Sequence, residues 1–290
     1  MDFGVVTMAL GRGTCSFEEG LATYRDIGFA SVLLIGIEGA QTVSADGTCP
    51  DLMPDTLHSD PDHVRRAVEN AGLELESVYF GGRAGWMDLE SASGTEKTLA
   101  NFREFAEGAV RLGCDCLSHA VASCGVTRRP TAEKKQQIQR LSFCMSETAR
   151  AFAEHGLTLC ADLHYKAWLE GLEDCRLFLN SMTSPNAGLL MNTGHLTTAE
   201  AYGWLLVREF PDQIPLVGWK DHSLAPDRPK EMLSVELGTG HCPFELYIRE
   251  FKKRSTPRIH VINCEDAPQG ERVEALRRSL AHLKRLWEEE

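Results

Sequence analysis

Short apolar runs rich in Val, Ile and Leu alternate with longer segments of helical spacing, and the alternation continues from one end of the chain to the other. Runs of this length predict strands, and apolar residues three or four positions apart predict helices that bury one face. The predicted strands span residues 3–9, 31–37, 75–80, 116–119, 157–163, 187–191, 214–220 and 258–264. The predicted helices span residues 16–27, 60–71, 95–112, 131–155, 169–182, 198–210, 243–253 and 270–289.

Local signals mark several of these boundaries. Ser16 precedes an apolar helix face and is followed three residues later by Glu19, which is the arrangement of a capping box. Pro61 stands at the first position of the second predicted helix, and Gly72 lies just past its end. These end signals agree with the spacing of the apolar residues.

Eight strand–helix units follow one another with no Pro- or Ser-rich linker, no shift in composition and no low-complexity tract. This order predicts one α/β domain spanning residues 1–290, a single (β/α)8 TIM barrel. An open doubly wound sheet is the alternative fold, and it would require a Gly-rich motif, G-x-G-x-x-G, after its first strand. Gly11 and Gly13 are present, but the third glycine position holds Ser16, so we reject that fold.

The charge balance narrows the class of partner. Lys and Arg number 30 and Asp and Glu number 42, a net charge of −12, so we expect neither a nucleic acid nor an anionic membrane as partner. No apolar run approaches the roughly 18 residues of a membrane helix, and the first residues lack a signal-peptide pattern. The ten cysteines form no C-x-x-C pair, which favours reduced, buried thiols and a cytoplasmic protein. A homo-oligomer stays open.

Ionisable and amide side chains gather at the carboxyl ends of the predicted strands. From the fourth strand to the eighth, these residues are His119, Asp162, His164, Asn192, His195, Lys220, His222 and Glu265. In a TIM barrel such strand ends meet at one face, where the active site lies. Five consecutive strand ends that carry such groups predict one shared cavity rather than isolated structural histidines.

The strand ends also carry family motifs. Residues 188–195 read Gly-Leu-Leu-Met-Asn-Thr-Gly-His, and residues 217–221 read Val-Gly-Trp-Lys-Asp. With Asp162-x-His164, the Gly238-Thr-Gly240 turn and Glu265, the sequence resembles the xylose isomerase-like barrels over nearly its whole length. That family includes sugar phosphate isomerases and epimerases, inosose dehydratases and endonuclease IV-type proteins. The resemblance implies a TIM barrel whose site lies at the strand ends.

The resemblance implies a divalent cation as well, but this chain departs from the family's ligand set. The family typically holds the cation with a Glu, an Asp, a His and a Glu on strands five to eight; here those positions are Asp162, Asn192, Gly218 and Glu265. The expected affinity for a hard cation falls with each change, because the first is shorter, the second neutral and the third without a side chain. His222 can replace the missing histidine only if the chain turns back, since four residues of strand span about 13 Å.

Two versions of the site therefore stay open. In the first, Asp162, Asn192, Glu265 and an imidazole from His222 or His195 hold Mn²⁺, Mg²⁺ or Zn²⁺, which polarises a substrate oxygen. This version, like the metal-free one described next, suits the removal of a proton from the carbon next to a carbonyl group.

In the second version no metal is bound. Asp162 or Glu265 acts as the base, His164 and His195 donate hydrogen bonds, and Lys220 stabilises the developing negative charge. These five residues form the predicted catalytic set. The site then works by hydrogen bonds and proton transfer alone.

Further side chains are expected to contact the substrate. They are His119, Asn192, Arg83, Trp86, Tyr165 and His222. Arg83 lies in a Gly-rich loop, where its guanidinium either binds an anionic group or stays solvated. Trp86 is placed to form an apolar wall, and Trp219 is expected to face the helices.

These features predict an isomerase, epimerase or lyase that acts on a small polyol or sugar-like carbonyl compound. A metal-free barrel that has lost catalysis and serves as a binding or subunit protein is the alternative. An endonuclease is the weakest reading, because it needs a basic groove and a histidine at the third strand end, and the net charge is −12.

Overall fold

The computed structural model describes residues 1–11, 13–36, 55, 57, 60–80, 86–120, 131–225, 228–254 and 257–290. Within these ranges, eight parallel strands close into a barrel, with each strand beside its neighbour in sequence and the last beside the first. The strands are β1 (Gly4–Val6), β2 (Ser31–Gly36), β3 (Glu74–Phe80), β4 (Cys116–Ala120), β5 (Thr158–Asp162), β6 (Ala187–Asn192), β7 (Leu216–Trp219) and β10 (Ile259–Ile262). The predicted (β/α)8 TIM barrel is therefore confirmed.

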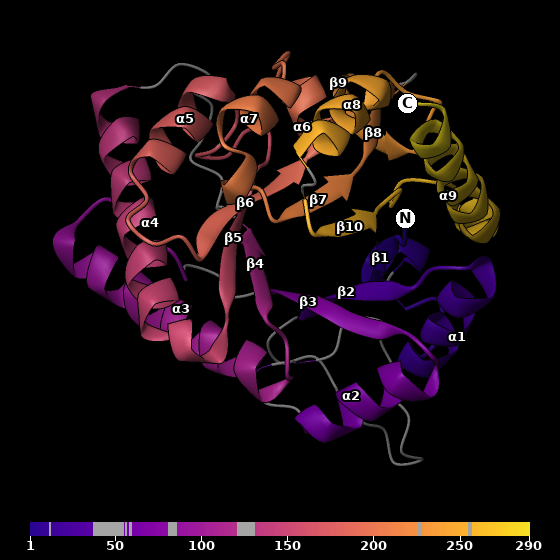
Figure 1. The fold of residues 1–290 in the computed structure, drawn as a ribbon, viewed down its shortest axis with the longest axis horizontal. Coiled ribbons are helices and arrows are strands. Elements are labelled where there is room, and N and C mark those ends of the chain that lie inside the picture. The colour runs from indigo at the N-terminus through magenta and orange to yellow at the C-terminus, as the bar shows by residue number, and fades with distance from the viewer. Residues whose placement is uncertain are drawn as a thin grey trace.

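The helices lie around the outside of the ring of strands (Figure 1). They are α1 (Phe17–Ile27), α2 (Pro61–Asn70), α3 (Ala92–Arg111), α4 (Ala132–Ala151), α5 (Leu172–Asn180), α6 (Thr193–Thr198), α7 (Trp204–Glu209), α8 (Phe244–Arg254) and α9 (Arg272–Glu289). Short 3₁₀ turns follow several elements, at Thr7–Leu10, Ala153–His155, Pro211–Gln213 and Gln269–Glu271. Among the described residues, no helix is both long and apolar enough to cross a membrane.

Helix α1 begins as its sequence predicts. The Ser16 hydroxyl accepts a hydrogen bond from the Glu19 amide at 3.2 Å, and the Glu19 carboxylate accepts one from the Ser16 amide at 2.9 Å. This reciprocal pair satisfies two amides that the first turn would leave without partners. At the other end Gly28 takes the left-handed conformation, with φ of +105°, and stops the helix before β2.

The first strand is shorter than predicted. Residues Thr7–Leu10 leave the sheet and form a 3₁₀ turn. The Tyr24 hydroxyl donates to the Thr7 carbonyl at 2.6 Å, and the Thr7 hydroxyl accepts from the Ile35 amide at 3.0 Å. Contacts of Thr7 with α1 and β2 therefore hold the chain where it leaves β1.

Two differences in the second half concern segments that were predicted as one helix and one loop. The predicted helix 198–210 is divided into α6 and α7, and α6 begins directly after β6. Gly203 lies between them against Tyr247 and Leu196, where a larger side chain would collide. The predicted loop 221–242 contains an antiparallel hairpin of β8 (Asp221–Ala225) and β9 (Arg228–Val235).

Apolar side chains fill the barrel interior beneath the carboxyl ends of the strands. They are Val6, Leu33, Cys116, Cys160, Leu190, Leu216, Ile259 and Val261, all buried. The sulfur atoms of Cys116 and Cys160 lie 3.8 Å apart as free thiols. Because this layer is packed, the barrel is closed below, and the space for a ligand lies above it at the carboxyl ends of the strands.

Candidate functional site

A cavity of about 190 Å³ lies at the carboxyl ends of the strands. Its polar lining comprises Tyr79, Asp162, His164, Asn192, Lys220, Asn263 and Glu265. The structure thus brings together five residues that the sequence placed at the ends of four different strands. Gly218 also lines the cavity and contributes backbone only.

Asp162, at the end of β5, is a buried carboxylate held from two sides. The Tyr79 hydroxyl donates to one of its oxygens at 3.0 Å, and the Asn192 amide nitrogen donates to the other at 3.1 Å. Burial raises the pKa of Asp162, and the nearby charges and these hydrogen bonds offset this only in part. The site therefore contains an oriented carboxylate that is more basic than an exposed aspartate.

Glu265 forms an ion pair with Lys220 across the strand ends. The Lys220 Nζ lies 2.8 Å from Glu265 Oε1, and the Asn263 amide nitrogen donates to Oε2 at 3.2 Å. Burial alone would raise the pKa of Glu265, but the attraction of the Lys220 charge and its hydrogen bond outweigh burial, so this pKa is lowered. Glu265 is therefore charged at neutral pH and fixes the ammonium in the cavity wall.

His164 is oriented by the backbone beside it. Its Nδ1 lies 2.7 Å from the carbonyl oxygen of Tyr165. A carbonyl oxygen only accepts, so Nδ1 carries the proton, and in the neutral ring Nε2 is an acceptor. In the neutral ring, Nε2 can therefore accept a hydrogen bond but not donate one, which differs from the donor role predicted for His164.

Two polar residues of the cavity were missed by the sequence reasoning. Tyr79 is the last residue but one of β3, and Asn263 lies two residues before Glu265. The two-residue alternation of a strand places Asn263 on the same face as Val261 and Glu265, which was the available signal. For Tyr79 the signal was a polar tip on an aromatic ring near the end of an apolar strand.

His195 and His222, which were predicted to contribute to the site, are not among the described residues that line the cavity. Helix α6 begins at Thr193, and this places His195 in its first turn instead of on β6. Its ring lies 3.6 Å from that of His164 and 4.7 Å from that of His222, measured between centroids. His222 Nδ1 is 2.7 Å from the Thr198 hydroxyl, and burial lowers its pKa to about 4. His195 thus packs on His164, and His222 packs on His195.

His119 and Trp86 also lie away from the cavity, which corrects the substrate contacts predicted for them. Cys116 on β4 faces the barrel interior, so the alternation along the strand turns His119 outward. Its ring packs on Phe102 of α3 at 4.4 Å and near Trp86 at 6.0 Å, centroid to centroid. Trp219 faces the helices, as expected, and packs against Phe244 and other rings.

We expect His119→Leu to stabilise the fold and to leave activity unchanged. Burial lowers the pKa of His119 to about 3, and neither ring nitrogen has a hydrogen-bond partner among the described residues. The unfolded chain takes up a proton on this residue below about pH 6.5 and the folded chain does not, so wild-type stability falls as pH drops.

Denaturant melts at pH 7.5 and pH 5.5 measure the effect. The gain is expected to be about 1 kcal/mol at the higher pH and to grow by about 1.4 kcal/mol per pH unit below 6.5. A loss of activity in a stable variant would contradict the position assigned to His119.

The Lys-Asp and Gly-x-Gly segments of the family resemblance have a structural role, because Asp221 connects them by hydrogen bonds. Its carboxylate is buried and accepts hydrogen bonds from the backbone amides of Gly238, Gly240 and Cys242, at 2.8 to 2.9 Å. These bonds tie the chain after β7 to the turn before α8. Asp221 therefore holds the loop that follows Lys220 and takes no part in the cavity.

Two further predicted contacts have different outcomes. Arg83 lies outside the described residues. Tyr165 stacks on His164, with ring centroids 5.3 Å apart, and is not among the described residues that line the cavity. Its ring keeps His164 in place.

The donor set of the cavity does not fit a divalent cation. Among the residues that the structure describes, no three His, Cys, Asp or Glu side chains are placed to hold a metal ion. Asp162 and Glu265 each accept hydrogen bonds on both oxygens, and the positive charge beside them is the Lys220 ammonium. Gly218 offers no ligand atom on its side chain. The cation ligands predicted at Asp162, Asn192, Glu265 and His222 thus do not form a set, because His222 lies elsewhere.

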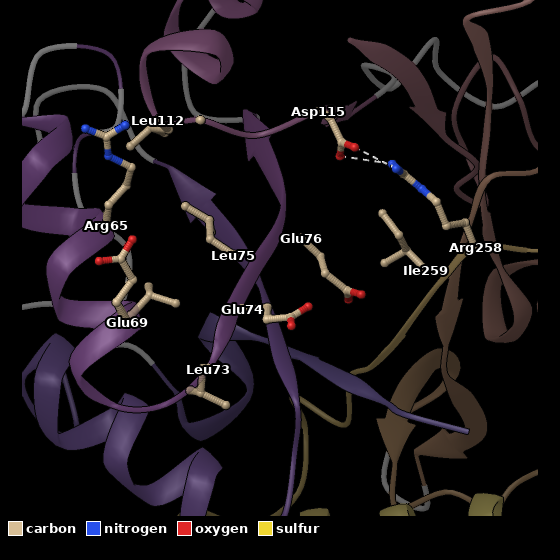
Figure 2. Close-up of a pocket in the computed structure, with 12 residues that line it drawn as sticks. Arg65, Glu69, Leu73, Glu74, Leu75, Glu76, Leu112, Asp115, Arg258 and Ile259 are labelled. Atoms are coloured by element: carbon tan, nitrogen blue, oxygen red, sulfur yellow. Dashed lines mark hydrogen bonds and ion pairs between the residues drawn. The ribbon is translucent and has the colours of Figure 1, made fainter. Parts of the chain in front are cut away.

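A larger hollow of about 650 Å³ lies at the opposite end of the barrel, where β3, β4 and β10 begin. Figure 2 shows Asp115 and Arg258 pointing toward each other at this end, joined by hydrogen bonds of 2.6 and 3.0 Å. Both side chains are about half exposed, and the pair joins two strand starts. In TIM barrels this end serves stability, so we place the functional site at the smaller cavity.

Comparison with known proteins agrees with the observed fold. Residues 10–286 match the family model described as xylose isomerase-like TIM barrel. No curated protein matches the sequence.

Among solved structures, the chain is similar to an L-ribulose 3-epimerase, with 17% identity, a TM-score of 0.73 and coverage of 99% of this chain and 95% of that one. A D-allulose 3-epimerase from Methylomonas sp., in complex with D-allulose, has 15% identity, a TM-score of 0.70 and coverage of 98% and 96%. The IOLI protein with a zinc atom has 11% identity, a TM-score of 0.72 and coverage of 100% and 99%. At these identities the likeness shows a shared fold.

Proposed function

The chain belongs to the xylose isomerase-like TIM barrel family, and from this premise we propose that it is a sugar isomerase- or epimerase-like enzyme. Its substrate is a polyhydroxylated carbonyl compound, and its reaction begins with removal of the proton next to the carbonyl. The observation that carries the proposal is the buried carboxylate of Asp162 in the same small cavity as the Lys220–Glu265 ion pair. The similar solved structures, two of them sugar 3-epimerases, support the substrate class.

Asp162 is the base in this mechanism. Its hydrogen bonds to Tyr79 and Asn192 fix the carboxylate, and its raised pKa brings it closer to the basicity that a general base needs at neutral pH. Glu265 is less suited, because Lys220 holds it in the charged, weakly basic form. Asp162 therefore removes the proton from carbon.

The electrons released at carbon move to the carbonyl oxygen and form an enediolate. Lys220 lies in the cavity wall as an ammonium fixed by Glu265, and its positive charge stabilises that oxygen. In its neutral form, His164 can accept a hydrogen bond from the neighbouring hydroxyl group through Nε2. The contact with Lys220 strengthens as negative charge develops on the carbonyl oxygen.

Return of the proton completes the reaction. If protonated Asp162 gives its proton to the former carbonyl carbon, while the proton of the neighbouring hydroxyl passes to the former carbonyl oxygen, the product is an isomer of the sugar. If the same carbon instead takes a proton from water on its opposite face, and Asp162 releases its own proton to solvent, the product is an epimer. Glu265 is charged through its ion pair with Lys220 and has no proton to give, so Asp162 is the carboxyl group that carries the abstracted proton.

The far wall of the cavity is apolar and limits how the substrate lies. Val6, Met8, Leu33 and Ile35, from the first two strand units, face this space. Hydroxyl groups pressed against these side chains would lose hydrogen bonds to water, so the carbonyl end lies toward Asp162 and Lys220. The described cavity is smaller than the roughly 300 to 1,000 Å³ of drug-sized ligand sites, which suits a small sugar.

A product screen tests the proposal. The purified protein is incubated with a panel of tetroses, pentoses and hexoses, as ketoses and aldoses, and with their phosphates, and chromatography separates the isomers. We expect conversion of at least one sugar to its isomer or epimer, and loss of that conversion in Asp162→Asn. Binding of a sugar without conversion would support the alternative of a binding barrel and contradict an isomerase.

A further inference from the structure

The resemblance places a histidine ligand for a cation at position 218. In this chain the residue is Gly218, and there is room for a side chain beside it. A Cβ atom added to Gly218 would lie 3.5 Å from Leu190 and 3.6 Å from the Asn192 side chain, which are ordinary contacts. Packing thus does not require glycine at this position. The residue two positions further along the chain, Lys220, also lines the cavity and carries the positive charge there.

The Lys220 ammonium is bound by the residue that is unchanged from the family's ligand set. Its Nζ lies 2.8 Å from Glu265 Oε1, and the side chain is 9% exposed, so this charge is held in the wall away from bulk water. A divalent cation at Glu265 would have to displace this ammonium or lie beside it. Two like charges a few ångströms apart in a partly buried site repel strongly, so the site favours one cation, and lysine supplies it.

Asn192 also suits a site without a divalent cation. Its amide nitrogen donates to Asp162 Oδ1 at 3.1 Å, so the amide presents N–H groups to the carboxylate where an aspartate ligand would present a second negative charge. The amide oxygen has no hydrogen-bond partner among the described residues, and as a neutral ligand atom it offers a hard cation less than the carboxylate of the family's aspartate. Asn192 and Tyr79 together satisfy Asp162 with neutral donors, as suits a free carboxylate base.

We propose that the Lys220 ammonium takes the place of a divalent cation in this barrel, so that the cavity works on its carbonyl substrate without a metal. The catalytic part of this inference rests on the proposed function. The proton passes from carbon to Asp162, the electron pair moves to the carbonyl oxygen, and Lys220 stabilises that oxygen with a hydrogen bond and its charge. No oxidant, reductant or co-reactant is consumed. The family's four ligand positions then have other roles. Asp162 is the base and Asn192 donates through its amide. Gly218 contributes no side chain, and Glu265 binds Lys220.

Metal binding tests this inference independently of any activity. Titration calorimetry with Mn²⁺ and with Zn²⁺ is run on the unaltered protein, on Gly218→His with Asn192→Asp, and on the same double variant with Lys220→Met. We expect no stoichiometric binding by the unaltered protein and at least 100-fold tighter binding by the triple variant. Thermal melts confirm that each variant is folded, and Asp212→Asn on the surface is the matched control.

Stoichiometric metal in the unaltered protein, by calorimetry or by elemental analysis of the purified chain, would overturn the inference and leave the proposed sugar chemistry standing. No metal binding together with no sugar conversion would leave the metal-free site standing and overturn the proposed function.

Activity adds a second readout once a substrate is known. Treatment with a chelator is expected to leave turnover unchanged, whereas Lys220→Met lowers kcat by about 100-fold and Lys220→Arg retains a measurable part of it. Loss of turnover on chelation, restored by Mn²⁺ or Zn²⁺, would contradict a role for Lys220 in place of the cation.

Discussion

Asp162→Asn is expected to lower kcat by about 1,000-fold and to leave the fold intact. General base catalysis typically contributes 10² to 10⁴ to the rate, and the asparagine keeps the shape of the side chain but cannot take a proton. Asn192 and Tyr79 would still surround the new amide. A loss confined to kcat, with KM little changed, would show that the carboxylate acts in the transition state.

The pH profile of the unaltered protein gives the same residue a second test. Because burial raises the pKa of Asp162, the acid side of the kcat/KM profile should lie above the range of an ordinary aspartate. Activity is lost as pH falls through that pKa, since the protonated acid is not a base. Asp212→Asn, an exposed aspartate, is the matched control, and equal activity of the two variants would remove Asp162 from the mechanism.

Glu265→Gln is expected to lower kcat/KM by about 100-fold, because Lys220 loses the carboxylate that holds it in the cavity wall. The glutamine oxygen can still accept a hydrogen bond from Lys220, so the cost in the free energy of unfolding is about 1 to 2 kcal/mol. Kinetics and thermal melting measure both effects. The control is Glu274→Gln in an exposed pair on α9, and unchanged activity of Glu265→Gln would exclude the ion pair from the mechanism.

Much of the fold follows from the sequence because each strand–helix unit repeats the same pattern of apolar residues. The capping box at Ser16 and the proline at position 61 are present where predicted. The hairpin β8–β9 was missed, since its residues were predicted as the loop between the strand 214–220 and the helix 243–253. The division of the predicted helix 198–210 depends on contacts of Gly203 with Tyr247, which are distant in sequence.

The sequence predicts where the candidate site lies in the barrel, but not the direction in which each side chain faces. Asp162, Lys220 and Glu265 stand at strand ends, so barrel geometry alone brings them together. His119 differs because one residue of strand register decides whether a side chain faces the cavity or the helices. His195 differs because α6 begins at Thr193, five residues before the predicted start of the helix at 198. These facings depend on register and helix onset, which a single sequence leaves open.

The cation site shows why residue types alone were insufficient. The sequence shows that three ligand positions have changed, but it does not show where the Lys220 ammonium lies. Only the 2.8 Å contact with Glu265, and the hydrogen bonds that both carboxylates accept, distinguish a metal-free site from a weakened one.

Proton exchange with solvent tests the central claim most directly. The chelator-treated protein is incubated in D₂O with the panel of ketoses and aldoses, and proton NMR follows the hydrogen on the carbon next to the carbonyl. We expect that hydrogen to be replaced by deuterium in at least one sugar, and the replacement to slow by about 1,000-fold in Asp162→Asn. Absence of exchange in every sugar, or equal exchange by Asp162→Asn, would contradict proton removal by Asp162 in this cavity.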